Sequence, residues 1–242
     1  MFRCDAEEAA VESSSSIGPA PITLDRVSVE IDGRMVLHDV SVGLTARTTA
    51  VIGANGSGKS TFARLLNGLV APRDGTVSVH GLDTVRDRAA LRKLVGFVFT
   101  NPDAQILMPT PAEDLALSLR GRPKSEVSEL VRETLETHGL AEHADVPAAV
   151  LSGGQKQLLA LASVLIADPH VIVADEPTTL LDLRNSRRIA DLLLGVQAQI
   201  VIVTHDLELA SRCDSALLFD EGRIVTSGVP SRVIAAYREA CA

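Results

Sequence analysis

The sequence contains the glycine-rich segment Gly53-Ala54-Asn55-Gly56-Ser57-Gly58-Lys59-Ser60. An apolar run at residues 48–52 predicts a buried strand before it, and residues 59–67 predict a helix after it. The segment matches the phosphate-loop pattern GxxxxGK[ST] in the strand–loop–helix context that this pattern requires. Glycines let successive backbone N–H groups surround phosphate oxygens, and the positive end of the helix dipole points at them. We therefore predict binding of a nucleoside triphosphate, with Lys59 on the β- and γ-phosphates and the Ser60 hydroxyl on Mg²⁺.

Short runs rich in Val, Ile and Leu alternate with longer helical segments from residue 22 onward, a pattern that predicts an α/β sheet. The predicted strands are residues 22–31, 36–44, 48–52, 76–80, 95–99, 171–174, 200–203, 216–219 and 224–227. The first two should pair as an antiparallel hairpin about Asp32-Gly33. The predicted helices are residues 59–67, 86–94, 125–138, 182–194 and 230–240. Prolines interrupt helical segments in the middle third, which indicates a helical insertion in the sheet domain.

Charge and composition exclude several classes of protein. The 242 residues include 23 Lys and Arg against 31 Asp and Glu, so the formal net charge is −8 and binding to nucleic acid is not expected. Only 2% of the residues are aromatic, which argues against base-stacking platforms for single strands. Three cysteines without CxxC spacing indicate a reducing compartment rather than a zinc site or a disulfide framework. The longest apolar run, residues 158–167, is far shorter than the roughly 20 residues of a membrane-spanning helix.

Residues 1–21 differ in composition from the rest of the chain. They contain several acidic residues and then a run of serines, without the basic and apolar regions of a secretion signal. We expect this segment to be a disordered leader.

Two apolar strands lead into polar residues. Residues 171–174 precede Asp175-Glu176, and residues 200–203 precede Thr204-His205. Open α/β sheets bind ligands at the carboxyl ends of their strands, so we expect these groups close to the phosphate loop. Neighbouring side chains on a strand point to opposite faces. Asp175 is therefore assigned to the magnesium shell and Glu176 to the attacking water, as general base or orienting group.

Both features also have a purely structural explanation. An isolated pair of acids commonly caps the helix that follows it, and a single histidine at a strand end is more often a hydrogen-bonded structural group. The phosphate loop favours the catalytic interpretation for the acids. Taken alone, the sequence around His205 leaves the role of this residue open.

A further segment, Leu151-Ser152-Gly153-Gly154-Gln155, begins a helix with Ser152 as a suitable N-cap. It resembles the signature motif of ATP-binding-cassette (ABC) ATPases. The order of the motifs from Gly53 to His205 also resembles that family. The resemblance implies an α/β fold: a P-loop NTPase (RecA-like) core with an antiparallel β subdomain and a helical insertion subdomain. The ABC ATPase domain would span residues 22–242, with the helical subdomain at about residues 100–160.

The resemblance also implies roles for individual residues. ATP would be bound by Gly53, Ala54, Asn55, Gly56, Ser57, Gly58, Lys59, Ser60 and Thr61. The signature residues that would contact the ATP of an opposite subunit are Ser152, Gly153, Gly154 and Gln155. Hydrolysis would then require a homodimer, or a heterodimer with a related ATPase. The cofactor Mg²⁺ would be held by Ser60 and Asp175, and the catalytic residues would be Glu176 and His205, with His205 on the γ-phosphate.

Three positions depart from the family pattern. Thr100 replaces the glutamine that usually follows the strand predicted at residues 95–99, and Leu158 replaces a basic residue after the signature. Ile31 stands where an aromatic residue commonly stacks on adenine, so the affinity for the base should rest on apolar contact.

Residues 98–110, together with Glu113-Asp114, resemble the ATPases of energy-coupling-factor (ECF) importers, and residues 177–185 are similar to the biotin-importer member. The resemblance implies ATP hydrolysis that drives uptake of a vitamin, with biotin favoured, or of a cobalt or nickel ion. The partners would be a transmembrane coupling protein and a substrate-binding membrane protein, with this chain peripheral on the cytoplasmic face of the membrane. The alternative is a soluble ABC ATPase that acts as an assembly scaffold in iron–sulfur cluster biogenesis.

Overall fold

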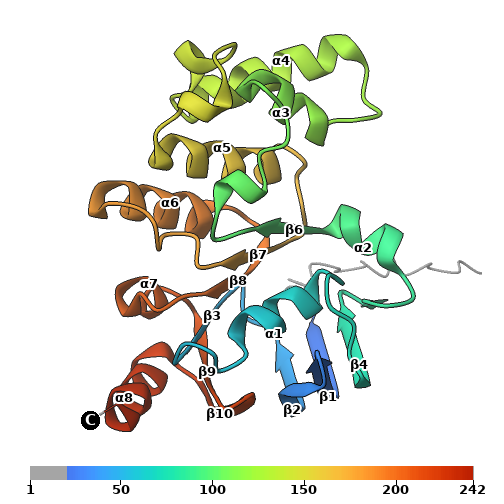
Figure 1. Cartoon of the computed structure of the whole chain (residues 1–242), viewed down its shortest axis with the longest axis vertical. Coiled ribbons are helices and arrows are strands. Elements are labelled where there is room, and N and C mark those ends of the chain that lie inside the picture. The colour runs from blue at the N-terminus through green and yellow to red at the C-terminus, as the bar shows by residue number, and fades with distance from the viewer. Residues whose placement is uncertain (1–20, 242) are drawn as a thin grey trace, which may run out of the picture.

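The computed structural model of the chain describes residues 21–241 and contains two β-sheets with helices around them (Figure 1). All but the last residue of the predicted leader lies outside the described residues. In the part that is described, no helix is both long and apolar enough to cross a membrane.

The larger sheet has the strand order β10-β9-β3-β8-β7-β6, and β6, β7, β8, β3 and β9 run parallel. Its strands are β3 (Thr48–Gly53), β6 (Val95–Val98), β7 (Val171–Asp175), β8 (Gln199–Val203), β9 (Ser215–Asp220) and β10 (Arg223–Gly228). Every residue of β3, β7 and β8 is buried. Burial on both faces explains why these strands are continuous apolar runs in the sequence.

Side-chain alternation divides the apolar residues of this sheet between two cores. Ile200 and Ile202 of β8 belong to a core that also includes residues of the helices after β6, whereas Val201 and Val203 belong to the core on the opposite face. The second core contains Phe62, whose ring lies 5.1 Å from that of Phe219. The sheet therefore has little room for polar side chains except beyond its strand ends.

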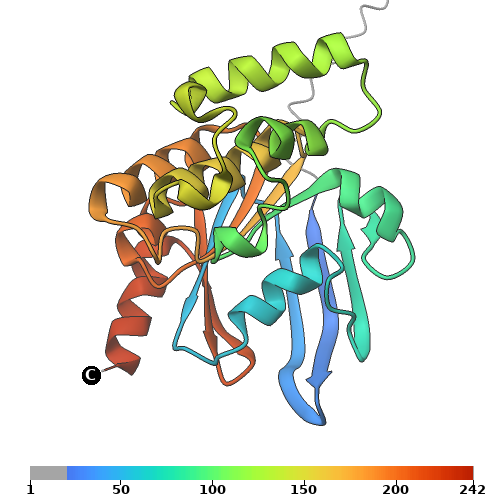
Figure 2. The ribbon, with the colours of Figure 1, turned by 45° about the horizontal axis from the view of Figure 1, so that its top comes forward.

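The smaller sheet is antiparallel, has the order β2-β1-β4-β5, and stands beside the larger one with α1 between the two (Figure 2). Its strands are β1 (Ile22–Ile31), β2 (Arg34–Leu44), β4 (Asp74–Val79) and β5 (Leu82–Asp83). Helix α1 (Lys59–Leu66) buries Phe62, Leu65 and Leu66 against both sheets and ends before Gly68, whose φ of 71° is left-handed. This is the helix end that the sequence predicts.

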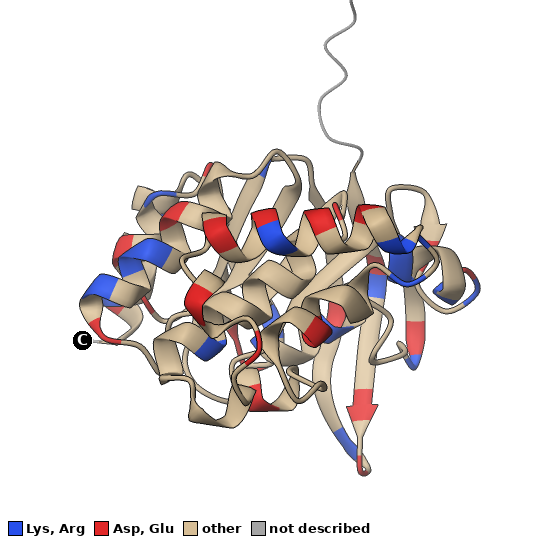
Figure 3. Cartoon of the chain, turned by 90° about the horizontal axis from the view of Figure 1, so that it is seen from above, with Lys and Arg blue, Asp and Glu red and all other residues tan. Residues whose placement is uncertain are grey.

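All of the chain between β6 and β7 is helical or irregular, and α3, α4 and α5 lie together at one end of the molecule (Figure 1). Besides α1, the helices of the described residues are α2 (Arg88–Leu94), α3 (Pro111–Ser118), α4 (Lys124–Thr137), α5 (Gly153–Leu165), α6 (Leu183–Gly195), α7 (Leu207–Ser211) and α8 (Pro230–Ala240), with 3₁₀ turns η1 (Pro102–Ala104), η2 (Ala141–His143) and η3 (Ala148–Val150). Acidic and basic residues are interspersed over the face seen from above (Figure 3).

The structure differs from the sequence prediction mainly at short elements. The strand predicted at residues 76–80 begins at Asp74 and ends at Val79, because His80 adopts a left-handed φ of 49°. Helices α3 and α7 and strand β5 are absent from the prediction. Both helices carry local signals, since the side chains of Thr110 and Asp206 accept hydrogen bonds from their first-turn N–H groups.

Gly96 on β6 tests how closely α5 packs on the sheet. A Cβ atom at this position would overlap Cγ1 of Val164 and crowd the ring of Pro169. We expect Gly96→Ala to lower the free energy of unfolding by about 1–3 kcal/mol, because a branched side chain on a packed helix cannot move aside freely. Urea unfolding followed by circular dichroism measures the change.

The matched control is Gly43→Ala on strand β2. In the part of the chain that the structure describes, no atom outside the two neighbours of Gly43 lies within 4 Å of a Cβ at this position. This variant should be as stable as the parent protein or slightly more stable. Equal stability of the Gly96 and Gly43 variants would contradict the close contact between α5 and β6.

Candidate functional site

The phosphate loop connects β3 to α1, and its glycines have backbone conformations that other residues rarely adopt. Gly53, Gly56 and Gly58 have φ angles of 146°, 81° and 99°. Gly58 is the N-cap of α1, and no side chain caps its N–H groups. Among the described residues, no atom outside the two neighbours of Gly56 lies within 4 Å of a Cβ at this position, so this part of the loop is open. The loop therefore presents free N–H groups and a positive helix end to an anion.

Lys59 lies within the same loop. Its Nζ atom donates hydrogen bonds to the carbonyl oxygens of Gly53 at 2.9 Å and Ala54 at 2.8 Å. Burial lowers the pKa of the Lys59 ammonium from its usual value, and the nearby carboxylates of Glu176 and Asp175 oppose that shift. The ammonium is thus held beside the loop, where it can move onto a phosphate without a large change in backbone.

Asp175 is the last residue of β7 and faces the first turn of α1. Its Oδ1 atom accepts a hydrogen bond from Ser60 Oγ at 2.9 Å, and Arg64 lies 3.9 Å from its Oδ2 atom. Burial raises the pKa of the Asp175 carboxyl, while the Ser60 hydrogen bond and the charge of Arg64 act in the opposite direction. A hydroxyl and a carboxylate at this distance are oxygen ligands of the kind that Mg²⁺ prefers, so the residues fit that ion.

Glu176 does not continue the strand as we expected from side-chain alternation. Its φ is 54°, a left-handed conformation that a glutamate adopts at an energetic cost, and β7 ends at Asp175. Glu176 N–H donates to the carbonyl of Val203 on β8 at 2.9 Å, which holds this turn. The turn, rather than the pleat of a strand, separates the directions of the Asp175 and Glu176 side chains.

His205 follows β8 and meets Glu176. Its Nδ1 atom lies 2.7 Å from Glu176 Oε2, which also accepts a hydrogen bond from Thr179 Oγ1 at 2.8 Å. The His205 side chain is 57% exposed, so its other ring nitrogen is available to a ligand. The structure thus brings together the phosphate loop, both acids and His205, as their positions after parallel strands predict.

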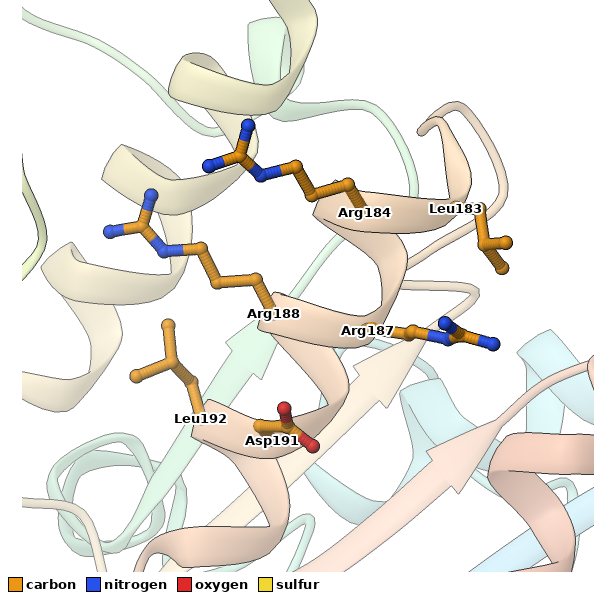
Figure 4. Close-up of a pocket in the computed structure, with 6 residues that line it drawn as sticks. All are labelled: Leu183, Arg184, Arg187, Arg188, Asp191 and Leu192. Atoms are coloured by element: carbon orange, nitrogen blue, oxygen red, sulfur yellow. The ribbon is translucent and has the colours of Figure 1, made fainter.

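A cleft of about 260 Å³ lies between the phosphate loop and Glu176. The cleft is lined by Val36, Asn55, Gly56, Gly58, Lys59, Ser60, Thr61 and Glu176. This lining contains no aromatic side chain, and Ile31 is 40% exposed on the neighbouring β1–β2 hairpin. A larger hollow of about 660 Å³ lies elsewhere, along α6, where Arg184 and Arg188 extend to one side and Leu183 and Arg187 to the other (Figure 4).

The signature residues do not line this cleft. Ser152 is the N-cap of α5 and forms a reciprocal capping box with Gln155. Within residues 21–241, no atom outside its own helix turn lies within 4 Å of a Cβ at Gly153. Leu158, which replaces the usual basic residue, is buried in the core under α5. In one copy of the chain, the signature and the phosphate loop are therefore separate surfaces.

The segment after β6 makes contacts that the sequence does not predict. Thr100 Oγ1 donates to the backbone carbonyl of Asp175 at 2.8 Å. Gln105 accepts a hydrogen bond from Phe99 N–H and donates one to the carbonyl of Ala160 on α5. Asp103 forms an ion pair with Lys156 of α5 at 2.7 Å. This segment thus connects the end of β7 to the helix that carries the signature, and only contacts distant in sequence reveal it.

Comparison with known proteins shows the family to which the chain belongs. Residues 37–179 match the model of the ABC transporter family. A putative ABC transporter ATP-binding protein of Deinococcus radiodurans is 46% identical over 220 residues, which cover 90% of this chain and 97% of the relative. The biotin transport ATP-binding protein BioM of Rhizobium etli is 39% identical over 91% of this chain and 99% of its own length.

Two further similarities concern transporter subunits. An energy-coupling factor transporter ATP-binding protein, EcfA1 of Lactobacillus delbrueckii subsp. bulgaricus, is 37% identical over 83% of this chain and 75% of its own length. The solved structure of cbiO1 from Clostridium perfringens, part of the ABC transporter complex cbiONQ, superposes with a TM-score of 0.79 at 30% identity, covering 88% of this chain and 90% of that one. The chain belongs to the ABC transporter family, as an ATP-binding subunit with the P-loop NTPase fold.

Proposed function

We propose that this chain is the ATP-hydrolysing subunit of an ECF-type importer and works at the cytoplasmic face of a membrane. The observation that carries the proposal is the pairing of Glu176 and His205 at 2.7 Å beside the Lys59 loop, because phosphate binding alone would not need it. The relatives that transport biotin or carry the energy-coupling-factor name support the importer branch.

The site residues suit hydrolysis of a phosphoanhydride. Mg²⁺, held through Ser60 Oγ and the Asp175 carboxylate, would neutralise charge on the phosphate oxygens. Lys59 and the N–H groups of the loop bind the phosphates. Glu176 accepts hydrogen bonds from His205 and Thr179, so its Oε2 atom is fixed, and its other oxygen can orient and deprotonate water.

The hydrolytic site is completed by a second subunit. The signature residues lie outside the cleft of their own chain, and the Gly153 face of α5 is open to an approaching group. Ser152, Gly153 and Gly154 of one subunit would contact the phosphates bound at Lys59 of the other. The partner is another copy of this chain or a related ATPase.

Biotin is the solute that we propose first, because the biotin transport relative matches nearly its whole length. A cobalt or nickel ion is the next candidate. The solute would bind to a membrane protein, with a transmembrane coupling protein between that protein and this chain. The segment of residues 99–112, which includes the exposed Leu107 and contacts α5, is our candidate for the docking surface.

Glu176→Gln tests the catalytic assignment. The amide keeps the size of the side chain but cannot take a proton from water, so kcat for ATP hydrolysis should fall by at least about 100-fold. ATP binding should remain, and a stable ATP-bound dimer should accumulate on gel filtration. Glu133→Gln on the exposed face of α4 is the control and should keep full activity. A Glu176→Gln protein that hydrolyses ATP at the parent rate would remove Glu176 from this role.

Nucleotide choice tests the consequence of the missing aromatic ring. Because Ile31 and Val36 offer only apolar contact to the base, we expect GTP to compete with ATP at a concentration within about tenfold of that of ATP. Competition against a fluorescent ATP analogue measures the two affinities. Discrimination against GTP by about 100-fold or more would show that another group reads the adenine ring.

The importer assignment has a direct test in the cell. Affinity purification of the chain in mild detergent should recover small membrane proteins, and deletion of its gene should lower uptake of labelled biotin. A deletion strain that expresses the Glu176→Gln variant should remain defective in biotin uptake. Uptake of cobalt and nickel by the same strains should be unchanged if biotin is the solute. Recovery of soluble assembly factors without a membrane protein would contradict the proposal.

A further inference from the structure

The side-chain amide of Gln155 in the signature has a fixed orientation. Its Oε1 atom accepts a hydrogen bond from Ser152 N–H at 2.8 Å, and the backbone N–H of Gln155 donates to Ser152 Oγ at 3.3 Å. Turning the amide over would place its NH₂ group against the Ser152 N–H, with a donor facing a donor. The NH₂ group of Gln155 must therefore point away from Ser152.

That NH₂ group points at His143. The Nε2 atom of His143, the last residue of η2, lies 3.0 Å from Gln155 Nε2. Since the amide can only donate here, His143 Nε2 must accept, and the neutral ring carries its proton on Nδ1. His143 Nδ1 is buried and has no hydrogen-bond partner among the described residues. The His143 ring thus accepts a hydrogen bond from Gln155 while its buried Nδ1 atom stays without a partner among the described residues.

The segment that carries His143 is itself held in place. The carbonyl of Ala144 accepts from Ala112 N–H at 3.0 Å, and Ala148 N–H donates to the carbonyl of Pro109 at 2.8 Å. Pro109 lies just before α3, and Ala112 lies in its first turn. His143 therefore occupies a position set by two segments and offers a fixed acceptor to Gln155.

A second polar side chain, that of Asn185, lies against the signature at Gly154. A Cβ at Gly154 would lie 2.8 Å from the amide group of Asn185 in the first turn of α6. Asn185 is fixed by two hydrogen bonds to Asp182, one from its backbone N–H and one from its side chain. By contrast, Gly153 is free of such neighbours. The first turn of α5 is thus restrained beside Gly154 and Gln155 and left open at Gly153.

We propose that His143 is a positioning residue for ATP hydrolysis, which acts by holding Gln155 and, through the capping box, the Ser152–Gly153 backbone. The proposal rests on the proposed function, because the signature matters to hydrolysis only at a site shared between two subunits. A fixed first turn presents its N–H groups to the partner's phosphates without reordering when the dimer forms.

Two substitutions separate this role from simple packing. His143→Leu replaces the ring with an apolar side chain of similar size and so removes the acceptor, and kcat should fall by at least about tenfold. His143→Gln places an amide oxygen at about the reach of Nε2 and should restore most of the activity. The affinity of the monomer for a fluorescent ATP analogue should be the same in all three proteins, because Lys59 and its loop are untouched.

His138→Leu is the matched control. His138 is a buried histidine of the same helical region, whereas His143 is partly buried. The Nδ1 atom of His138 lies 2.8 Å from the carbonyl oxygen of Thr134, and among the described residues neither ring nitrogen forms a hydrogen bond with the signature. This variant should keep the parent kcat whatever its effect on thermal stability. Equal losses of kcat in the His138 and His143 variants would show a general loss of stability and overturn the proposal.

Hydrogen–deuterium exchange gives a readout that does not depend on hydrolysis. Without nucleotide, the peptide that contains residues 151–155 should exchange faster in His143→Leu than in the parent and be protected again in His143→Gln. Unchanged exchange, unchanged kcat in His143→Leu, or no recovery in His143→Gln would each overturn the role of His143. If the three proteins show this exchange pattern but the parent protein hydrolyses no ATP, the result would instead contradict the proposed function.

Discussion

Burial of the parallel sheet on both faces is the constraint on which the rest of the molecule depends. Strands β3, β7 and β8 have no exposed residue, so polar chemistry can be placed only where the strands end. Parallel pairing brings the carboxyl ends of these strands to one edge. The phosphate loop, Asp175 and His205 therefore meet although they are far apart in the sequence.

At the carboxyl ends of the strands, backbone strain and burial prepare the side chains of the site for a ligand. Glu176 adopts a left-handed backbone and is held by Val203 on the neighbouring strand, which costs free energy that a purely structural turn would save by using glycine. Burial also shifts the pKa of Lys59 downward and that of Asp175 upward, so both charges are less stable than in water. An anion and a cation that bind here relieve both effects.

The sequence predicts the features that depend on local patterns. The strand–loop–helix of the phosphate loop and the ends of α8 at residues 230–240 are read from short-range signals. The conformation of Glu176 is different, because a hydrogen bond to β8 imposes it and the residue itself does not favour it. Contacts between residues distant in the chain, such as the hydrogen bond from the Gln105 side chain to the carbonyl of Ala160, leave no periodic signal and emerge only from the fold.

In the proposed function, one chain holds an incomplete hydrolytic site. The direct measurement is the specific ATPase activity of the isolated chain as a function of its concentration, with the monomer–dimer distribution in ATP followed by sedimentation. The activity per chain should rise with concentration in proportion to the dimer fraction and then level off. The same activity per chain in a sample that sediments as monomer would contradict the account.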